Sequence, residues 1–287
     1  MTVTYWGVRG SYPSPGAHTL RYGGHTTCVS VETDEAVLVL DVGTGAEALG
    51  AAILAAPAKP ILVLFTHAHV DHLLGLPFFA PLYARDRTVH LFDLDLDGHA
   101  WSPLSIFGTR LVSPALTDLS CAPRRVAPAD AGSVLRAHGF EVHRLRVNHP
   151  GGAYAYRIAH GGSSLVFAPD SELDPPRPST PAHEIAAFCD GADVLIHDAQ
   201  YVDADLPFKH GWGHSLVHQA CALADAAGVG RLVLFHHDPH RSDDAIDALQ
   251  AESRLALGRR GIACDAAFQG GTLVLGPAAS APVLRAA

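Results

Sequence analysis

The sequence of 287 residues has little charge, few cysteines and no long apolar run. Charged residues make up 17% of the chain, and 20 Lys and Arg face 29 Asp and Glu, which gives a formal net charge of −9. This shortage of positive charge argues against general electrostatic binding of nucleic acid polymers. Hydrophobic residues nevertheless make up 48%, so the chain should fold around a large core.

The five cysteines lie far apart and form no CxxC pair, which argues against a disulfide framework and a structural zinc knuckle. The first residues, MTVTYWGVRGSYPSPG, contain no basic segment followed by an apolar one, and no later run approaches the length of a membrane span. Nothing in the sequence is typical of an interdomain linker. We therefore expect a cytoplasmic protein with reduced thiols, no membrane partner and one domain over residues 1–287.

Short apolar runs rich in β-branched residues predict strands, at 28–32, 36–43, 61–65, 88–92, 141–147, 154–159, 164–170, 193–198, 231–237 and 272–276. Alanine-rich amphipathic stretches predict helices, at 45–56, 181–189, 215–228 and 242–258. Ser215 is the expected N-cap of the third helix, and Gly228 its expected end. Runs of strands precede βα alternation in each half, which predicts an α/β fold of two facing sheets with helices on the outer faces.

Residues 66–72, THAHVDH, place three histidines and an aspartate directly after the apolar run ILVLF. In an extended segment His67 and His69 point to the same side and can hold one ion. Asp71 and His72 follow and can face a second ion. The alternative is that these histidines are solvated turn residues in a chain that has 19 His. Two metal sites also require more donors than this stretch supplies.

Further donors occur where other predicted strands end. His149, Asp170 and His236 each follow or end an apolar run, as His67 does. Considered alone, each of these three residues would be interpreted as an ordinary turn residue. Because α/β folds gather sites from distant parts of the sequence at strand ends, the shared placement favours one common site.

The stretch THAHVDH resembles the HxHxDH signature of the metallo-β-lactamase superfamily, and the later donors match its remaining ligand positions in order. The resemblance spans nearly the whole chain and implies an αββα sandwich of two mixed sheets with a dinuclear centre at one edge. It implies a first metal bound by His67, His69, His149 and Asp170, and a second bound by Asp71, His72, Asp170 and His236. Asp170 would bridge them. His and carboxylate donors suit two zinc ions, with manganese or iron as alternatives.

Two further stretches resemble the tRNase Z branch of that superfamily: DVLIHDAQY (193–201) and GWGHS (211–215). Asp198 stands where that branch carries a Glu. The resemblance implies phosphodiester hydrolysis by a metal-bridging hydroxide, with His214 as general acid and Asp198 orienting or charging it. Asp71 has a second possible task, accepting a proton from the attacking water. His197 either supports the site or is a strand-end histidine bonded to backbone.

The sequence departs from tRNase Z between His149 and Asp170, where that family inserts an arm that grips tRNA. Here only about twenty residues intervene, and they are typical of a hairpin. We therefore expect no tRNA arm and a small phosphodiester substrate, preferably a cyclic nucleotide or another cyclic phosphate. The alternatives are a hydrolase of a lactone, thioester or β-lactam, and a metal-stabilised binding protein without activity.

Several segments keep two interpretations each. The segment 93–130 is interpreted either as a lid or as an oligomer contact. Substrate selectivity would come from this segment or from the loop 201–213. Phe208 and Trp212 in that loop either stack on a base or pack the loop. His25, in a Gly-rich turn, either contacts substrate or is structural. A homodimer is compatible with the resemblance, since related enzymes often complete one subunit's site with a loop of the other.

Overall fold

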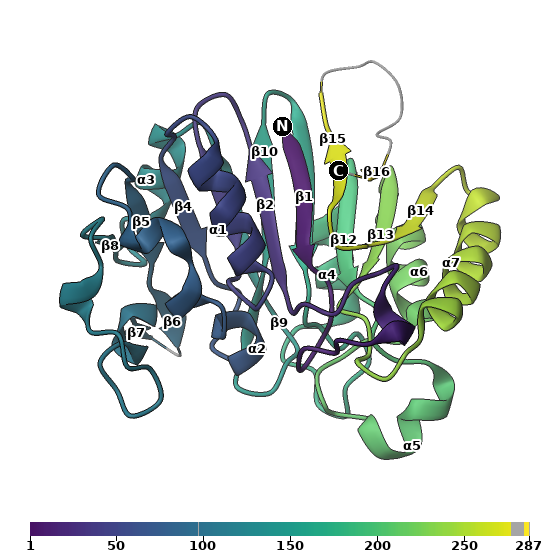
Figure 1. Cartoon of the computed structure of the whole chain (residues 1–287). Helices are drawn as coiled ribbons and strands as arrows, with labels where there is room; N and C mark the ends of the chain where they lie inside the picture. The colour runs from purple at the N-terminus through teal and green to yellow at the C-terminus, as the bar shows by residue number, and fades with distance from the viewer. Residues whose placement is uncertain (97, 277–283, 287) are drawn as a thin grey trace.

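The computed structural model describes residues 1–96, 98–276 and 284–286, which form two large β-sheets with helices outside them (Figure 1). The first sheet has the strand order β16-β15-β1-β2-β3-β4-β5-β8. Its strands are β1 (Thr2–Gly7), β2 (Cys28–Glu32), β3 (Val37–Leu40), β4 (Ile61–Leu64), β5 (Val89–Phe92), β8 (Arg124–Val126), β15 (Gly271–Val274) and β16 (Leu284–Ala286). β3, β4, β5 and β8 are parallel, and the remaining pairs are antiparallel, so the sheet is mixed.

The second sheet has the order β14-β13-β12-β11-β10-β9. Its strands are β9 (Glu141–Val147), β10 (Ala153–His160), β11 (Ser163–Ala168), β12 (Val194–Asp198), β13 (Arg231–Phe235) and β14 (Ala263–Ala266). β9, β10 and β11 pair antiparallel, whereas β11 to β14 are parallel. β9 therefore runs in the same direction as β11, β12 and β13, and the carboxyl ends of these four strands share one edge.

Three apolar layers explain why the sheets stack. Alternate residues such as Leu38 in β3 and Ile196 in β12 meet in the core between the sheets. The opposite face of β3 and β4 is covered by α1 (Ala46–Ala55), and the opposite face of the second sheet by α4 (Ala182–Cys189), α6 (Val217–Ala226) and α7 (Asp243–Gly258). The predicted αββα architecture is therefore confirmed.

Short elements complete the described chain. They are α2 (Val70–Leu73), α3 (Ala131–Ala137), α5 (Leu206–Lys209), the hairpin β6 (Leu94–Leu96) and β7 (His99–Trp101), and the 3₁₀ turns η1 (Ala17–Thr19), η2 (Leu76–Phe78), η3 (Ala80–Tyr83), η4 (Pro103–Ile106), η5 (Leu116–Asp118) and η6 (Asp203–Asp205). The segment 93–130 thus contains β6 to β8 and two 3₁₀ turns. Every helix within the described residues is too short or too polar to cross a bilayer.

The segment between His149 and Asp170 is the predicted hairpin of β10 and β11. His160 pairs with Ser163 across a two-residue turn of Gly161 and Gly162, both at positive φ (59° and 80°). Such φ values at both turn positions are typical of tight hairpin loops and favour glycine. The hairpin leaves no inserted arm among the described residues 150–169.

One predicted helix boundary is wrong. Ser215 is not the N-cap of α6, because Leu216 occupies that position and Gln219 accepts the Leu216 amide. The buried Ser215 hydroxyl instead donates to the carbonyl of Ser171 at 2.5 Å. Gly228 does follow the helix at φ 59°, as predicted.

Candidate metal centre

The predicted site residues meet at the edge where strands of both sheets end, near α2 in Figure 1. His67 lies just after β4, His149 after β9, Asp170 after β11 and His236 after β13. The remaining members come from the start of α2, with His69 at its N-cap and Asp71 and His72 inside it. The convergence predicted from the strand ends is thus present in the structure.

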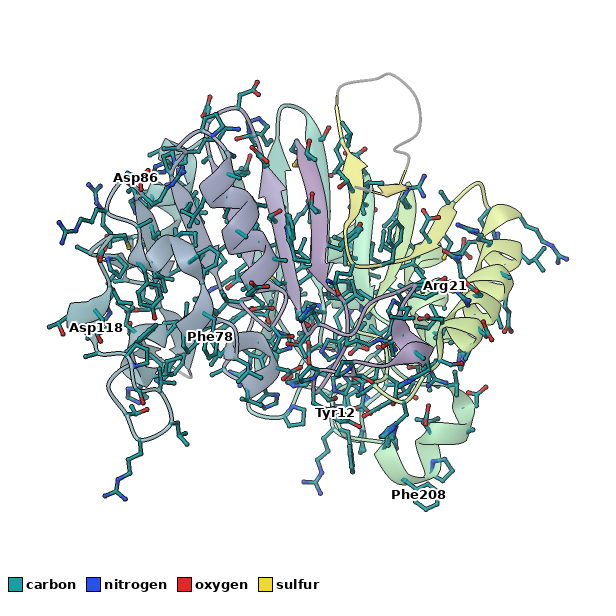
Figure 2. All side chains as sticks on the ribbon, in the orientation of Figure 1. Tyr12, Arg21, Phe78, Asp86, Asp118 and Phe208 are labelled. Atoms are coloured by element: carbon teal, nitrogen blue, oxygen red, sulfur yellow. The ribbon has the colours of Figure 1, made fainter. Side chains whose placement is uncertain are left out.

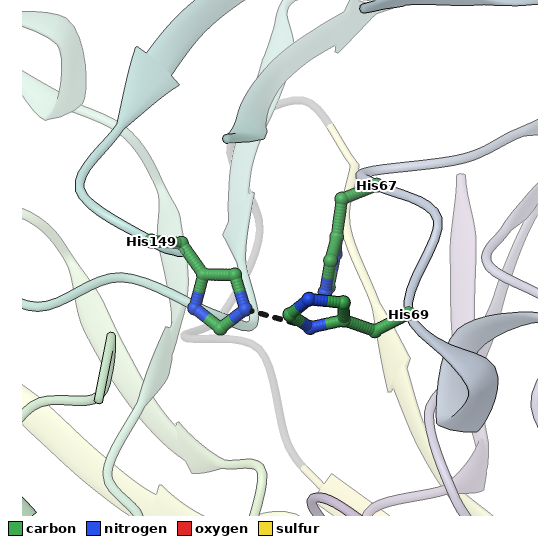
Figure 3. Close-up of side chains that lie close together, drawn as sticks. All are labelled: His67, His69 and His149. Atoms are coloured by element: carbon green, nitrogen blue, oxygen red, sulfur yellow. Dashed lines mark hydrogen bonds between the residues drawn. The ribbon is translucent and has the colours of Figure 1, made fainter. Parts of the chain in front are cut away.

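His67, His69 and His149 form the first group, and their ligand atoms lie within 4.8 Å of one another (Figure 3). His69 Nδ1 and His149 Nε2 are 3.0 Å apart. One oxygen of Asp170, Oδ2, lies 3.8 Å from His67 Nε2 and 3.7 Å from His149 Nε2.

Asp71, His72 and His236 form the second group. Asp71 Oδ2 lies 3.3 Å from His72 Nε2 and 3.4 Å from His236 Nε2. The other oxygen of Asp170, Oδ1, is 3.1 Å from His72 Nε2 and 3.3 Å from His236 Nε2. The two oxygens of Asp170 thus face the two groups, an arrangement that suits a carboxylate bridging two ions.

Several atoms that face the centre have no protein partner. His67 Nε2, His72 Nε2, His236 Nε2 and Asp170 Oδ1 are buried and lack a hydrogen-bond partner among the described residues. Buried polar atoms without partners are costly and call for an explanation. Imidazole nitrogens and carboxylate oxygens at these spacings are a donor set that zinc accepts, so the residues fit two divalent ions.

Asp41 orients two of the histidines. The His72 Nδ1–H donates to Asp41 Oδ2 at 2.8 Å, and Thr66 Oγ1 donates to the same oxygen at 2.8 Å. The Thr66 hydroxyl in turn accepts from His67 Nδ1 at 3.0 Å. This network fixes the tautomer that leaves each Nε2 lone pair facing the centre.

A second network orients His149 and His236. His149 Nδ1 donates to the carbonyl of Gly213 at 2.9 Å, and His236 Nδ1 donates to Gln200 Oε1 at 3.0 Å. Gln200 Nε2 donates to the hydroxyl of Ser11, whose backbone amide donates to Asp71 Oδ2 at 2.9 Å. Gln200 and Ser11 therefore connect two members of the second group.

Charge balance in the centre also favours cations. Burial lowers the pKa of His149 to about 4, which keeps the imidazole neutral at pH 7, as a ligand must be. Burial would also lower the pKa of His72, but Asp170, Asp71 and Asp41 raise it well above its usual value. The three carboxylates that raise it give the centre a local negative charge, which divalent ions would neutralise.

Backbone strain is concentrated around the centre. Among the described residues, four non-glycine residues have positive φ, and three of them are Ser11 (61°), Asp41 (59°) and His236 (59°). Such conformations cost energy and persist at functional sites where the surroundings enforce them. The neighbouring chain is equally constrained, because a Cβ on Gly10 would lie 2.5 Å from His236 Nδ1.

His214 and Asp198 form a hydrogen-bonded pair beside both groups. His214 Nδ1 donates to Asp198 Oδ2 at 2.8 Å, and its ring stacks on that of His236 with centroids 5.1 Å apart. The amides of Ser171 and Gln200 also donate to Asp198. Burial lowers the pKa of His214, and Asp198 more than offsets this, so the pKa lies above its usual value.

Glu172 holds the loop that carries His214. The buried Glu172 carboxylate accepts the amides of Gly211 at 2.7 Å and Gly213 at 2.8 Å. The Gly213 carbonyl is the acceptor of His149 Nδ1, and His214 is the next residue in the chain. One carboxylate therefore fixes both a candidate ligand and the imidazole beside the centre.

The histidines His197 and His25, and His237 beside the candidate ligand His236, are hydrogen-bonded to other parts of the fold. His197 is fully buried, and its Nδ1 donates to the backbone carbonyl of Asp198, which agrees with the structural interpretation. His237 Nε2 donates to the carbonyl of Ala267, away from the two groups, so His236 is the better candidate of that pair. His25 Nδ1 contacts Thr44 Oγ1 at 3.1 Å.

Exposed aromatic side chains flank this edge of the protein. Phe208 is 82% exposed and Trp212 59% exposed, so neither side chain is buried by its own loop. Figure 2 shows Phe208 at the tip of α5 and Phe78 on the other side of the edge, with Tyr12 between them in this view. These rings remain available to a substrate.

Comparisons with known proteins agree with the fold and the site. Residues 39–237 match a family model described as the beta-lactamase superfamily domain. Ribonuclease Z of Shouchella clausii is 26% identical over 216 residues, which are 61% of this chain and 68% of that protein.

Two solved structures resemble the fold. YhfI of Bacillus subtilis, a metallo-beta-lactamase fold protein, has 22% identity and a TM-score of 0.68, with 94% of this chain and 98% of that chain covered. Human tRNase Z, short form, has 20% identity and a TM-score of 0.58, with 99% and 100% covered.

Proposed function

This chain belongs to the metallo-β-lactamase superfamily, whose domain occupies residues 39–237, and we propose that it is a dinuclear phosphodiesterase that hydrolyses a small phosphodiester. Membership of the family and the clustered His and Asp side chains make it a metal-dependent hydrolase. The proposal concerns the bond it cleaves and the residues that do so. A cyclic nucleotide or another cyclic phosphate is the preferred substrate.

The observation that carries the proposal is the His214–Asp198 pair beside the two ligand groups. Cleavage of a phosphodiester expels an alkoxide, which needs a proton, and an imidazolium held by a carboxylate supplies one. Hydrolysis of a lactone, thioester or β-lactam has no obvious need for this pair. The ribonuclease Z relative also supports phosphodiester chemistry, since ribonucleases cleave that bond.

The proposed mechanism assigns metal binding and proton transfer to different side chains. His67, His69, His149 and Asp170 would hold one zinc ion, and Asp71, His72, Asp170 and His236 the other; manganese or iron are alternatives. When bound, the ions supply an activated water at neutral pH and neutralise phosphoryl charge. Asp71, whose Oδ2 already accepts the Ser11 amide, also accepts a proton from the attacking water. His214 protonates the leaving oxygen, and Asp198 keeps the imidazole charged and oriented.

A substrate screen with metal analysis on the same preparation tests the proposal. We expect about two ions per chain and turnover of bis(p-nitrophenyl) phosphate and of at least one cyclic nucleotide. Acyl-homoserine lactones and β-lactams serve as the contrasting panel. Rapid lactone hydrolysis alongside inert phosphodiesters would refute the proposal in favour of an acyl hydrolase.

Replacing Glu172 tests the positioning of His149 and His214. In Glu172→Gln one of the two glycine amides loses its acceptor, because the side-chain NH₂ cannot accept a hydrogen bond. We expect turnover to fall by roughly tenfold to a hundredfold, the usual effect of losing an outer partner of a metal site. The control is Glu184→Gln on the outer surface of α4, which should leave turnover unchanged. Wild-type turnover and metal affinity in Glu172→Gln would contradict this role.

A further inference from the structure

Arg9 is a fully buried arginine that the proposed mechanism does not use. Arginine is almost never buried to this extent unless its guanidinium group is paired. Its Nε donates to the carbonyl of Gly23 at 2.8 Å, and its Nη1 donates to the carbonyls of Asp238 at 3.1 Å and Arg241 at 2.8 Å. Nη2 forms an ion pair with Asp243 Oδ1 at 3.6 Å. One guanidinium group therefore joins the loop between β1 and β2, the loop after β13 and the start of α7.

The backbone of Arg9 lies against the loop that carries a candidate ligand. The Gly10 amide donates to the carbonyl of His237 at 3.0 Å, and the His237 amide donates to the carbonyl of Val8 at 2.9 Å. These two hydrogen bonds lie on either side of Arg9 and pair it with His237 as an isolated β-bridge. Arg9 is thus held, by backbone and side chain, beside the residues that directly follow His236.

The residues after Arg9 connect it to the second ligand group. The Ser11 amide donates to Asp71 Oδ2 at 2.9 Å from a left-handed conformation with φ 61°. A serine keeps this conformation only where its surroundings enforce it. Gly10 has no space for a side chain, because a Cβ there would lie 2.5 Å from His236 Nδ1. A shift of this segment would therefore displace both Asp71 and His236.

The first ligand group is held from other parts of the described chain. His67 Nδ1 donates to the hydroxyl of Thr66, and His149 Nδ1 donates to the carbonyl of Gly213. These contacts come from the end of β4 and from the loop before α6, not from the loops that Arg9 joins. A displacement of Arg9 should therefore weaken one metal position more than the other.

Resting on the proposed function and its two-metal centre, we propose that Arg9 is a positioning residue for the second metal position. Its guanidinium group holds the Ser11 turn and the loop after β13 in the geometry that lets Asp71 and His236 bind one ion together. Arginine suits this task because its planar group donates in several fixed directions at once, whereas a lysine ammonium is a single point charge. Because Arg9 is fully buried, it acts through these two ligands and not on the substrate.

Equilibrium dialysis of the zinc-loaded enzyme against a series of zinc buffers tests this role in Arg9→Lys and Arg9→Gln. Lysine keeps the positive charge opposite Asp243, glutamine avoids an unpaired buried charge, and neither side chain can reach all three carbonyls. We expect one ion to bind as in the wild type and the other to bind about tenfold to a hundredfold more weakly, the usual effect of losing an outer partner of a metal site. Turnover of bis(p-nitrophenyl) phosphate should fall at limiting zinc and recover as the second position fills.

Anomalous X-ray scattering identifies the position that is lost. In crystals of Arg9→Lys at the intermediate zinc concentration, the remaining ion should lie among His67, His69 and His149. An ion that instead remains with Asp71, His72 and His236 would overturn the proposal.

Arg87→Lys is the matched control. Arg87 is also buried, and its Nη2 donates to the carbonyls of Leu54 and Ala56 at 3.1 Å each, at the end of α1. This variant should lower the melting temperature while both ions keep their wild-type affinities.

Three results would show that Arg9 serves stability alone: unchanged affinity for both ions in the Arg9 variants, an equal loss of both ions, or failure of both variants to fold. Each would overturn the positioning role and leave the phosphodiesterase proposal standing, since that proposal is tested on the wild-type enzyme. A wild-type enzyme that binds two ions and cleaves no diester of the screen refutes the phosphodiesterase proposal, while the zinc affinities still decide the role of Arg9.

Discussion

Asp170→Asn should abolish the proposed dinuclear centre. The substitution keeps the size of the side chain but replaces a carboxylate whose two oxygens face the two ligand groups at 3.1–3.8 Å. An amide has one oxygen and no charge, so it cannot bridge two cations. We expect metal content to fall from about two ions per chain to one or fewer, and turnover to fall by about 10³ or more, because several kcal/mol of charge stabilisation are lost.

A buried carboxylate elsewhere in the fold provides the control. Asp265 in β14 pairs with Arg231 and Arg254, so Asp265→Asn also removes a buried negative charge. It should lower the melting temperature and leave the metal content at the wild-type value. Mass spectrometry of the native protein distinguishes the two variants. Two ions bound by Asp170→Asn would mean that Asp170 is not the bridge.

Residues whose role depends on a local pattern could be predicted from the sequence. The stretch 66–72 carries its own spacing. Asp170 and His236 are recognisable because each follows a strand with an evident apolar run, and His149 because it follows the predicted strand EVHRLRV. Parallel strands then bring these ends together whatever the details of packing. The layers of the fold followed from the same periodicity.

Residues whose role depends on tertiary contacts could not be predicted. Asp41 and Glu172 are ordinary carboxylates in the sequence, and only the fold brings them to His72 and to the amides of Gly211 and Gly213. The strands β1, β8, β14 and β16 were not predicted. TVTYWG in β1 is rich in β-branched and aromatic residues and did carry a strand signal, whereas RRV, ACDA and LRA carry little of one and are stabilised by pairing with neighbouring strands.

His214→Ala should reduce turnover strongly on substrates with a poor leaving group and only weakly on substrates with a good one. An imidazolium that protonates the departing oxygen contributes about 10²–10⁴-fold when that oxygen is a poor leaving group. We therefore expect a loss of that size on cyclic nucleotides, which expel an alkoxide, and a much smaller loss on p-nitrophenyl esters. Metal content should stay at the wild-type value, because His67, His69, His149, Asp170 and the second group are retained. His218→Ala, an exposed histidine in α6, is the control and should match the wild type on both substrates.

The pH dependence separates the roles of His214 and Asp198. The general acid must carry a proton, so turnover falls as the pH rises through the pKa of His214. Burial lowers that pKa, and the Asp198 carboxylate raises it above its usual value. Asp198→Asn removes the raising charge but keeps a hydrogen-bond acceptor, so the basic limb of kcat for an alkoxide-expelling substrate should move to lower pH. An unmoved basic limb, or an equal loss on good and poor leaving groups in His214→Ala, would assign the pair a structural role only.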